Sequence, residues 1–207
     1  MHFCQTHHIH LLSDEIYAPT VFSSPDPNTH PFTSVLALNS TIDPDLLHVI
    51  YGTAKGFIPG LRIGALITRN VALKKAYTSI VRFHGVSGPA VVIAATMLED
   101  QEWCEKFLEL SRERIREAYV YFIKRLNSMQ VRHSGGVNAG LFVYIDLSPW
   151  LEEDLGQGRK KREQELAGRA LEKGLFLQPI EEHAVEVGWF RVVYTLEKRV
   201  LEEGLRR

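Results

Sequence analysis

The feature that most constrains the fold is a short apolar segment that leads into a glycine-rich loop carrying a lysine. Residues 47–50, Leu-His-Val-Ile, predict a β-strand, and the loop at 51–64 contains Lys55 and, seven residues later, Arg62. A lysine in such a loop can form a Schiff base with an aldehyde cofactor, while the arginine pairs with that cofactor's phosphate. The simpler interpretation is a solvated surface loop, and this loop alone does not exclude it.

A second apolar segment ends in polar residues of complementary chemistry. Residues 9–12 predict a short strand, and Asp14 and Tyr17 follow it. Ligands of open α/β sheets gather at the carboxyl ends of strands. Asp14 could there pair with a protonated pyridine nitrogen, and Tyr17 could reach a phenolic oxygen on the same ring. Taken alone, Asp14 is equally an exposed acid that caps a strand end.

Several ordered motifs together resemble a known family. They are Ser-Asp-Glu-Ile-Tyr at 13–17, Lys55 with Gly-Leu-Arg-Ile-Gly at 60–64, Asn-Ala-Gly-Leu-Phe-Val-Tyr-Ile-Asp-Leu at 138–147 and Gly-Trp-Phe-Arg-Val at 188–192. In this order and spacing they resemble the class I/II aminotransferases, which are pyridoxal-phosphate enzymes of fold type I. The nearest resemblance is to the branch that contains 1-aminocyclopropane-1-carboxylate synthases and their fungal relatives. It extends from about residue 3 to residue 195.

The resemblance implies a role for each motif residue. Lys55 would carry pyridoxal 5'-phosphate as an aldimine and would move the proton at the substrate Cα. Four further residues would bind the cofactor: Asp14, Tyr17, Thr53 and Arg62. Among these, Asp14 would hold the pyridine nitrogen, Tyr17 the ring oxygen and Arg62 the phosphate. Arg191 would clamp the substrate α-carboxylate, for which a planar guanidinium is suited.

The lysine loop departs from the family pattern in two ways. The family usually has serine or threonine on both sides of the position of Thr53, where this chain has glycine and alanine. The family also usually has an aspartate directly after the lysine and one more residue before the arginine, whereas Gly56 follows Lys55 here. We therefore expect a shift of Arg62 relative to the phosphate unless the loop compensates, and a shift of about 1 Å can be costly in catalysis.

The resemblance also predicts the fold class and the domains. We expect an α/β chain in which residues 1–100 are the C-terminal part of the large cofactor-binding domain and residues 101–207 are the small domain with Arg191. Because the chain starts close to the Asp14 strand, we expect about half of a family subunit to be absent. The absent part would include the glycine-rich turn and helix N-terminus that hold phosphate.

Two kinds of function remain open at this point. One is an enzyme that acts on an amino acid and a keto acid by transamination, or by lyase chemistry of the 1-aminocyclopropane-1-carboxylate synthase type, in secondary-metabolite biosynthesis and as a homodimer at full length. The other is a truncated, catalytically inactive remnant. Because phosphate donors are lost, we expect the chain by itself to bind the cofactor weakly and to turn over little substrate.

Composition narrows the remaining possibilities. The chain has 24 Lys and Arg against 25 Asp and Glu, which gives no basis for binding nucleic acid or an anionic membrane. Cys4 and Cys104 form no Cys-x-x-Cys pair and fit a reduced, cytoplasmic compartment. His8 and His10 lie on one strand face, but no set of ligands completes a metal site. No apolar run approaches the ~20 residues of a membrane span.

Hydrophobic periodicity and capping residues predict the other elements. We expect helices at 71–81 (capped by Asn70), up to 98 (starting near Pro89), 100–129, 164–173 and 197–205. The long helix has one apolar face, formed by Leu108, Ile115, Tyr119, Phe122 and Leu126. Strands are expected at 61–68, 137–147, 175–179 and 190–195, a strand or a helical turn at 34–38, and solvated loops at 21–31 and 152–162.

Overall fold

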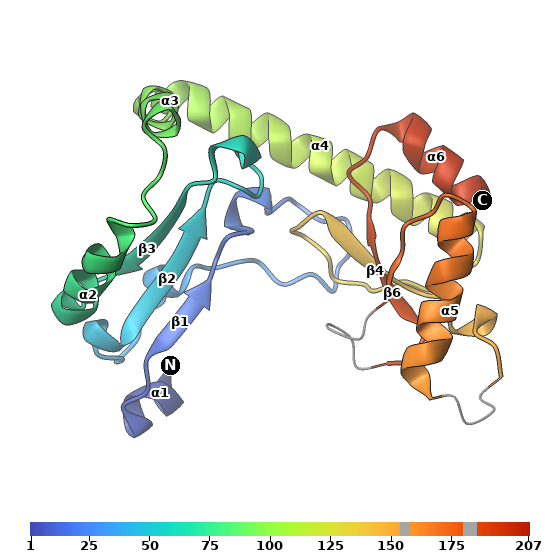
Figure 1. Ribbon diagram of the computed structural model, residues 1–207, viewed down its shortest axis with the longest axis horizontal. Coiled ribbons are helices and arrows are strands. Elements are labelled where there is room, and N and C mark those ends of the chain that lie inside the picture. Colours follow the sequence, from blue (N-terminus) through green and yellow to red (C-terminus); the bar gives the residue numbers. More distant parts are fainter. Residues whose placement is uncertain (154–157, 180–185) are drawn as a thin grey trace. The chain divides into compact units, whose positions relative to one another are not determined.

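The computed structural model describes residues 1–153, 158–179 and 186–207 (Figure 1). The chain divides into two compact units: Met1–Val21 with Pro31–Glu113, and Phe22–His30 with Arg114–Arg207. The part of the predicted charged loop that holds Gly156 lies outside the described residues. The division predicted from the sequence, with residues 1–100 as part of the cofactor-binding domain and residues 101–207 as the small domain, stays a prediction.

The first unit contains a three-stranded sheet in the order β1-β2-β3. Strand β1 (Leu11–Asp14) is parallel to β2 (Leu47–Gly52), and β3 (Gly64–Thr68) is antiparallel to β2. Asp14, the last residue of β1, pairs with Ile50 near the end of β2. Because carboxyl ends of parallel strands meet at one edge of a sheet, the segments after β1 and β2 leave the sheet on the same side.

Helices of the first unit follow the predicted pattern with one addition. They are α1 (His2–His7), α2 (Val71–Val81), α3 (Gly88–Glu99) and the first half of α4 (Gln101–Ser128). The Asn70 side chain accepts a hydrogen bond from the Leu73 amide at 2.8 Å, which confirms the predicted cap. Helix α1 was not predicted, because six residues with no apolar stripe carry no periodic signal.

The second unit is built on the apolar face of α4. Its residues Ile115, Tyr119, Phe122 and Leu126 are buried, as predicted, whereas Leu108 of the first unit is only half-buried. They belong to one core with residues of an antiparallel sheet, β4-β6-β5, whose strands are β4 (Phe142–Asp146), β5 (Gln178–Pro179) and β6 (Trp189–Val193).

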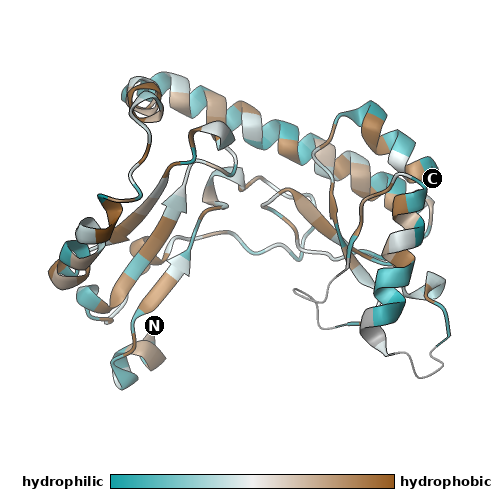
Figure 2. Cartoon of the chain, in the orientation of Figure 1, coloured by the Kyte–Doolittle hydropathy of each residue, from teal (hydrophilic) through white to brown (hydrophobic). Residues whose placement is uncertain are grey.

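The helix α5 (Arg159–Glu172) corrects the sequence analysis. Residues 159–162 were predicted to lie in a solvated loop, but they form the first turn of this helix, which is mostly hydrophilic in Figure 2. Arginine, lysine and glutamate are good helix formers, so a charged segment need not be a loop. Gly174, with φ of 79°, follows the helix in the left-handed conformation that favours glycine. The last helix is α6 (Lys198–Arg206).

Several strands were predicted to be longer than they are. The strands expected at 61–68, 137–147 and 175–179 are shorter, because 3-10 turns and loops take up their ends. Residues 34–38 contain a helical turn and not a strand. The 3-10 helices are η1 (Ala18–Thr20), η2 (Val35–Ala37), η3 (Pro44–Leu46), η4 (Pro59–Leu61) and η5 (Ser148–Trp150).

None of the helices within the described ranges is both long and apolar enough to cross a membrane. Within the same ranges, no group of three or more His, Cys, Asp or Glu side chains could hold a metal ion. Cys4 and Cys104 are both free thiols.

Candidate active site

Asp14 and the start of the lysine loop lie at the same edge of the first unit's sheet, at the ends of the paired strands β1 and β2. The amide of Glu15 donates to the Ile50 carbonyl at 2.9 Å, so the parallel pairing continues one residue past Asp14. The Ile16 amide donates to Asp14 Oδ1 at 3.2 Å. This short turn fixes an exposed carboxylate at the end of β1, next to the end of β2.

Tyr17 and Lys55 are in contact. The Lys55 Nζ lies 5.5 Å from the centroid of the Tyr17 ring, within the range of a cation–π interaction. The Thr20 hydroxyl donates to the Tyr17 carbonyl at 2.7 Å, which holds the turn after β1. Lys55 is half-buried. The structure thus brings together two residues that are 38 positions apart and that the sequence analysis assigned to one site.

Gly56 explains why the residue after the lysine is not the usual aspartate. Its φ is +81°, a backbone conformation that residues other than glycine adopt only at a cost in free energy. A Cβ added there would lie 2.7 Å from Cγ2 of Thr20 and 3.2 Å from Cβ of Pro19. The lysine loop therefore packs directly on the η1 turn, and this close approach requires glycine.

An aromatic group in the first unit anchors the same loop. The Phe57 ring meets Phe107 edge-on, with centroids 5.3 Å apart, and Trp103 at 6.0 Å. Trp103 and Phe107 stack on each other at 5.1 Å. This contact was not predicted from the sequence, although two aromatic residues four positions apart on a helix face are a recognisable signal.

Thr53 and Arg62 stand at the two ends of the lysine loop. The Thr53 amide and hydroxyl both donate to the Ile63 carbonyl, at 3.0 and 3.2 Å. The exposed Arg62 has φ of 54° and directs Nη1 toward the Pro59 carbonyl at 3.5 Å. The loop is therefore closed by Thr53, and Arg62 is the residue just before the closing contact.

Arg191 lies on β6 of the second unit. Its guanidinium carbon is 4.7 Å from the centroid of the Phe142 ring, and Nη2 donates to Oε1 of Gln178. The side chain is half-buried. Its expected closeness to Lys55, 136 positions away, stays a prediction.

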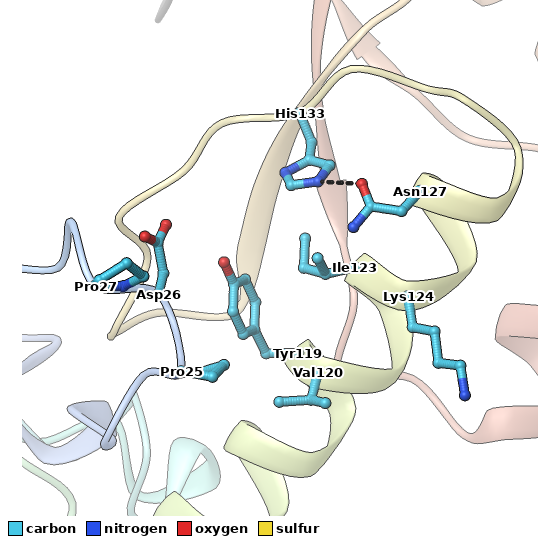
Figure 3. Close-up of a pocket in the computed structure, with 9 residues that line it drawn as sticks. All are labelled: Pro25, Asp26, Pro27, Tyr119, Val120, Ile123, Lys124, Asn127 and His133. Carbon is cyan, nitrogen blue, oxygen red and sulfur yellow. Dashed lines mark hydrogen bonds between the residues drawn. The ribbon is translucent and has the colours of Figure 1, made fainter.

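The second unit also contains a pocket of about 430 Å³ that holds none of the predicted site residues (Figure 3). Hydrogen bonds from the backbone amides of Gly136 and Asn28, at 2.6 and 2.9 Å, lower the pKa of Asp26 at its rim. His133 Nε2 lies 3.1 Å from the side-chain oxygen of Asn127, as the dashed line in Figure 3 marks. These contacts join the loops of the second unit to each other and to α4.

Comparison with known proteins gives a family for the whole chain. The family described as Aminotransferase class I and II matches residues 1–207. The chain is 35% identical over 195 residues to the mouse protein named "Probable inactive 1-aminocyclopropane-1-carboxylate synthase-like protein 2", covering 93% of this chain and 32% of that protein. It is 33% identical to 1-aminocyclopropane-1-carboxylate synthase 7 of Arabidopsis thaliana, covering 99% and 45% respectively.

Solved structures share the fold. A double mutant of Thermus thermophilus aspartate aminotransferase superposes with a TM-score of 0.79 at 22% identity, covering 99% of this chain and 49% of that one. Thermotoga maritima aspartate aminotransferase gives 0.75 at 19% identity, covering 99% and 48%. These structures confirm the predicted α/β fold. The family model that matches residues 1–207 confirms the family resemblance on which this prediction rests. The chain spans about a third to a half of the length of these relatives.

Proposed function

Because the chain belongs to the class I and II aminotransferase family, we propose that it provides the cofactor-bonding part of a pyridoxal 5'-phosphate enzyme that acts on an amino acid. The observation that carries this proposal is the contact between Lys55 and Tyr17 beside the end of the Asp14 strand. The lysine contacts the phenol ring, the carboxylate ends the neighbouring strand, and each group has the chemistry that one part of the cofactor ring requires.

These residues fit the cofactor at its ring end. When bound, pyridoxal phosphate withdraws electrons from the substrate Cα and makes its proton acidic. The Asp14 carboxylate would face the pyridine nitrogen and keep it protonated. The Tyr17 hydroxyl would donate to the ring oxygen. The Lys55 amine, half-buried beside Tyr17, would bond the cofactor and then take and return the proton at Cα.

The phosphate and the substrate carboxylate would be held by the remaining predicted residues. Arg62 would pair with the phosphate, and the Thr53 hydroxyl would turn from the Ile63 carbonyl and donate its hydrogen bond to the same group. Arg191 would bind the α-carboxylate, which requires its guanidinium to come close to Lys55 in the working enzyme. The assignment of these three residues rests on the family motifs and on their position in loops and strands of the fold.

Three outcomes of the reaction are candidates within this proposal. Transamination between an amino acid and a keto acid is the first candidate. The likeness to an Arabidopsis 1-aminocyclopropane-1-carboxylate synthase favours a lyase or synthase as the second. The likeness to a mouse protein whose name calls it inactive favours a non-catalytic member as the third. We also propose that either enzyme acts in a secondary-metabolite pathway and that the full-length protein is a homodimer.

Reductive labelling tests the proposal directly. The purified chain is saturated with pyridoxal phosphate, reduced with borohydride, digested and mapped by mass spectrometry. We expect the pyridoxyl group on Lys55, and we expect Lys55→Ala to lose the visible absorbance of the bound cofactor. Lys74→Ala, a change on the helix α2, serves as the matched control and should keep that absorbance. Labelling spread over Lys74, Lys75 and Lys124 would contradict the assignment.

A further inference from the structure

Arg191 lies on the central strand of the second unit's sheet, on its half-buried face. Strand β6 lies between β4 and β5, and Arg191 pairs with Tyr144 on one side and with Gln178 on the other. Directly paired residues of antiparallel strands point to the same face. The alternate residues Val143 and Phe190 are fully buried in the core. Arg191, Tyr144 and Gln178 are half-buried and form the opposite face.

Two neutral groups fix the guanidinium. The Phe142 ring lies 4.7 Å from its central carbon, and the amide oxygen of Gln178 accepts from Nη2. In the part of the chain that the structure describes, no carboxylate forms an ion pair with Arg191. Among the residues that the structure describes, the positive charge is therefore oriented but not neutralised, which is the state required of a receptor for an anionic ligand.

The chemistry of arginine also fixes the orientation of the Gln178 amide. A guanidinium has donors and no acceptor, so the atom of Gln178 that meets it must be the oxygen. The amide nitrogen then points away from the contact and has two hydrogens to donate. A ligand on Arg191 would meet both the guanidinium and this neutral donor.

We propose that Arg191 and Gln178 form a composite carboxylate site in which Gln178 and Phe142 are positioning residues. This inference rests on the proposed function of Arg191 and deepens it. Gln178 holds one nitrogen of the guanidinium and leaves its charge available, while Phe142 supports the plane from one side. The ligand class is an organic monocarboxylate. A glutamate at position 178 would have nearly the same shape, but would neutralise Arg191 and repel the ligand.

The test needs no cofactor. The probe is sodium propionate, with neutral propanamide as its isosteric control, titrated into the 207-residue chain labelled with ¹⁵N-arginine. The Nε–Hε resonance of Arg191, assigned by its loss in Arg191→Lys, reports binding. We expect saturable shifts with propionate and none with propanamide. Gln178→Glu should raise the propionate Kd about tenfold or more, since it replaces a neutral acceptor by a competing anion.

Three further variants make the result decisive. Gln164→Glu places the same charge change on an exposed position of α5 and should leave the Kd within about twofold. If Gln178→Glu does not fold, Gln178→Met removes the amide without adding charge and should raise the Kd about threefold or more. Phe142→Leu should weaken binding by about two- to tenfold.

The possible failures are distinguishable. A propionate Kd that is equal in the unmodified chain and in the Gln178 variants would overturn the inference while leaving Arg191 as the receptor. Propionate binding that survives Arg191→Lys, followed on the propionate methyl signal because the Arg191 resonance is then absent, would overturn both the inference and the proposed role of Arg191. Failure of the unmodified chain to bind propionate would also overturn the inference. The assignment of Lys55 is decided separately, by reductive labelling.

Discussion

Replacing Gly56 with alanine should destabilise the first unit by about 2–5 kcal/mol, because two costs add at this position. Its φ of +81° is strained for any residue with a Cβ, at about 1–2 kcal/mol. The new methyl group would also lie 2.7 Å from Cγ2 of Thr20, and overpacking of this kind costs about 1–3 kcal/mol. Thr20 is fully buried, so its methyl group cannot relieve the contact by turning into solvent.

Gly60 of the same loop provides the matched control. A Cβ added at Gly60 would meet nothing within 4 Å, and its φ is not in the left-handed range. Gly60→Ala should change stability by no more than about 0.5 kcal/mol, or stabilise slightly through the unfolded chain. The two variants therefore differ in packing and backbone conformation while the chemical change is the same.

Urea unfolding, combined with amide hydrogen exchange of residues 53–63, measures the effect. We expect Gly56→Ala to lower the free energy of unfolding of the first unit and to speed exchange at the Thr53 amide, which Ile63 protects in the native loop. If Gly56→Ala and Gly60→Ala were equally stable and equally protected, the loop would not pack on the η1 turn as described. The reason given for the missing aspartate would then be wrong.

Three further predictions concern burial. Burial, followed by the charge of the neighbouring His10, lowers the pKa of His48 below its ordinary value of 6.5. The stabilising effect of neutral His48 should therefore be complete above pH 6.5 and decrease as the pH falls below it. The free energy of unfolding, measured between about pH 5 and 8, should depend less on pH in His48→Gln. Tyr194→Phe removes the hydroxyl that donates to the Gly140 carbonyl at 2.7 Å, and should lower the free energy of unfolding by about 1–2 kcal/mol in urea titrations. Phe122→Ala should lower the free energy of unfolding by about 3–5 kcal/mol in the same assay, because Phe122 is buried in the core. Val120 is 40% exposed, so Val120→Ala should lower it by about 0.5 kcal/mol or less. Similar values for the two variants would contradict the core assignment.

Local signals predicted much of the fold. The apolar stripe of α4 follows from residue spacing, and the Asn70 cap follows from one side chain before an apolar run. Element boundaries were less predictable, because they depend on chemistry beyond the pattern. Residues 159–162 looked like a solvated loop on account of their charge, yet their intrinsic helix propensity decided the outcome.

Contacts between distant segments lay beyond the sequence analysis. Motif resemblance selected Lys55 and Tyr17 for one site, and the structure brings them into contact. No motif singled out Phe57 or Gln178, because each acts through a partner on another element: the aromatic pair on α4 for Phe57 and Arg191 on the neighbouring strand for Gln178. Side-chain partners across a sheet depend on strand register, which a single sequence specifies only weakly when a strand is two residues long.

The shortened lysine loop illustrates how the fold absorbs a departure from a family pattern. Pairing of Gly52 with Gly64 and the two hydrogen bonds from Thr53 to Ile63 close the loop at its base. Arg62 immediately precedes Ile63, which belongs to this base. The pairing of β2 with β3 therefore sets its position relative to the end of β2, and the number of residues in the loop does not. The missing residue falls between the two ends, in a segment that turns sharply at Gly56 and continues into η4. A shortened loop therefore does not by itself remove Arg62 from the edge where Lys55 lies.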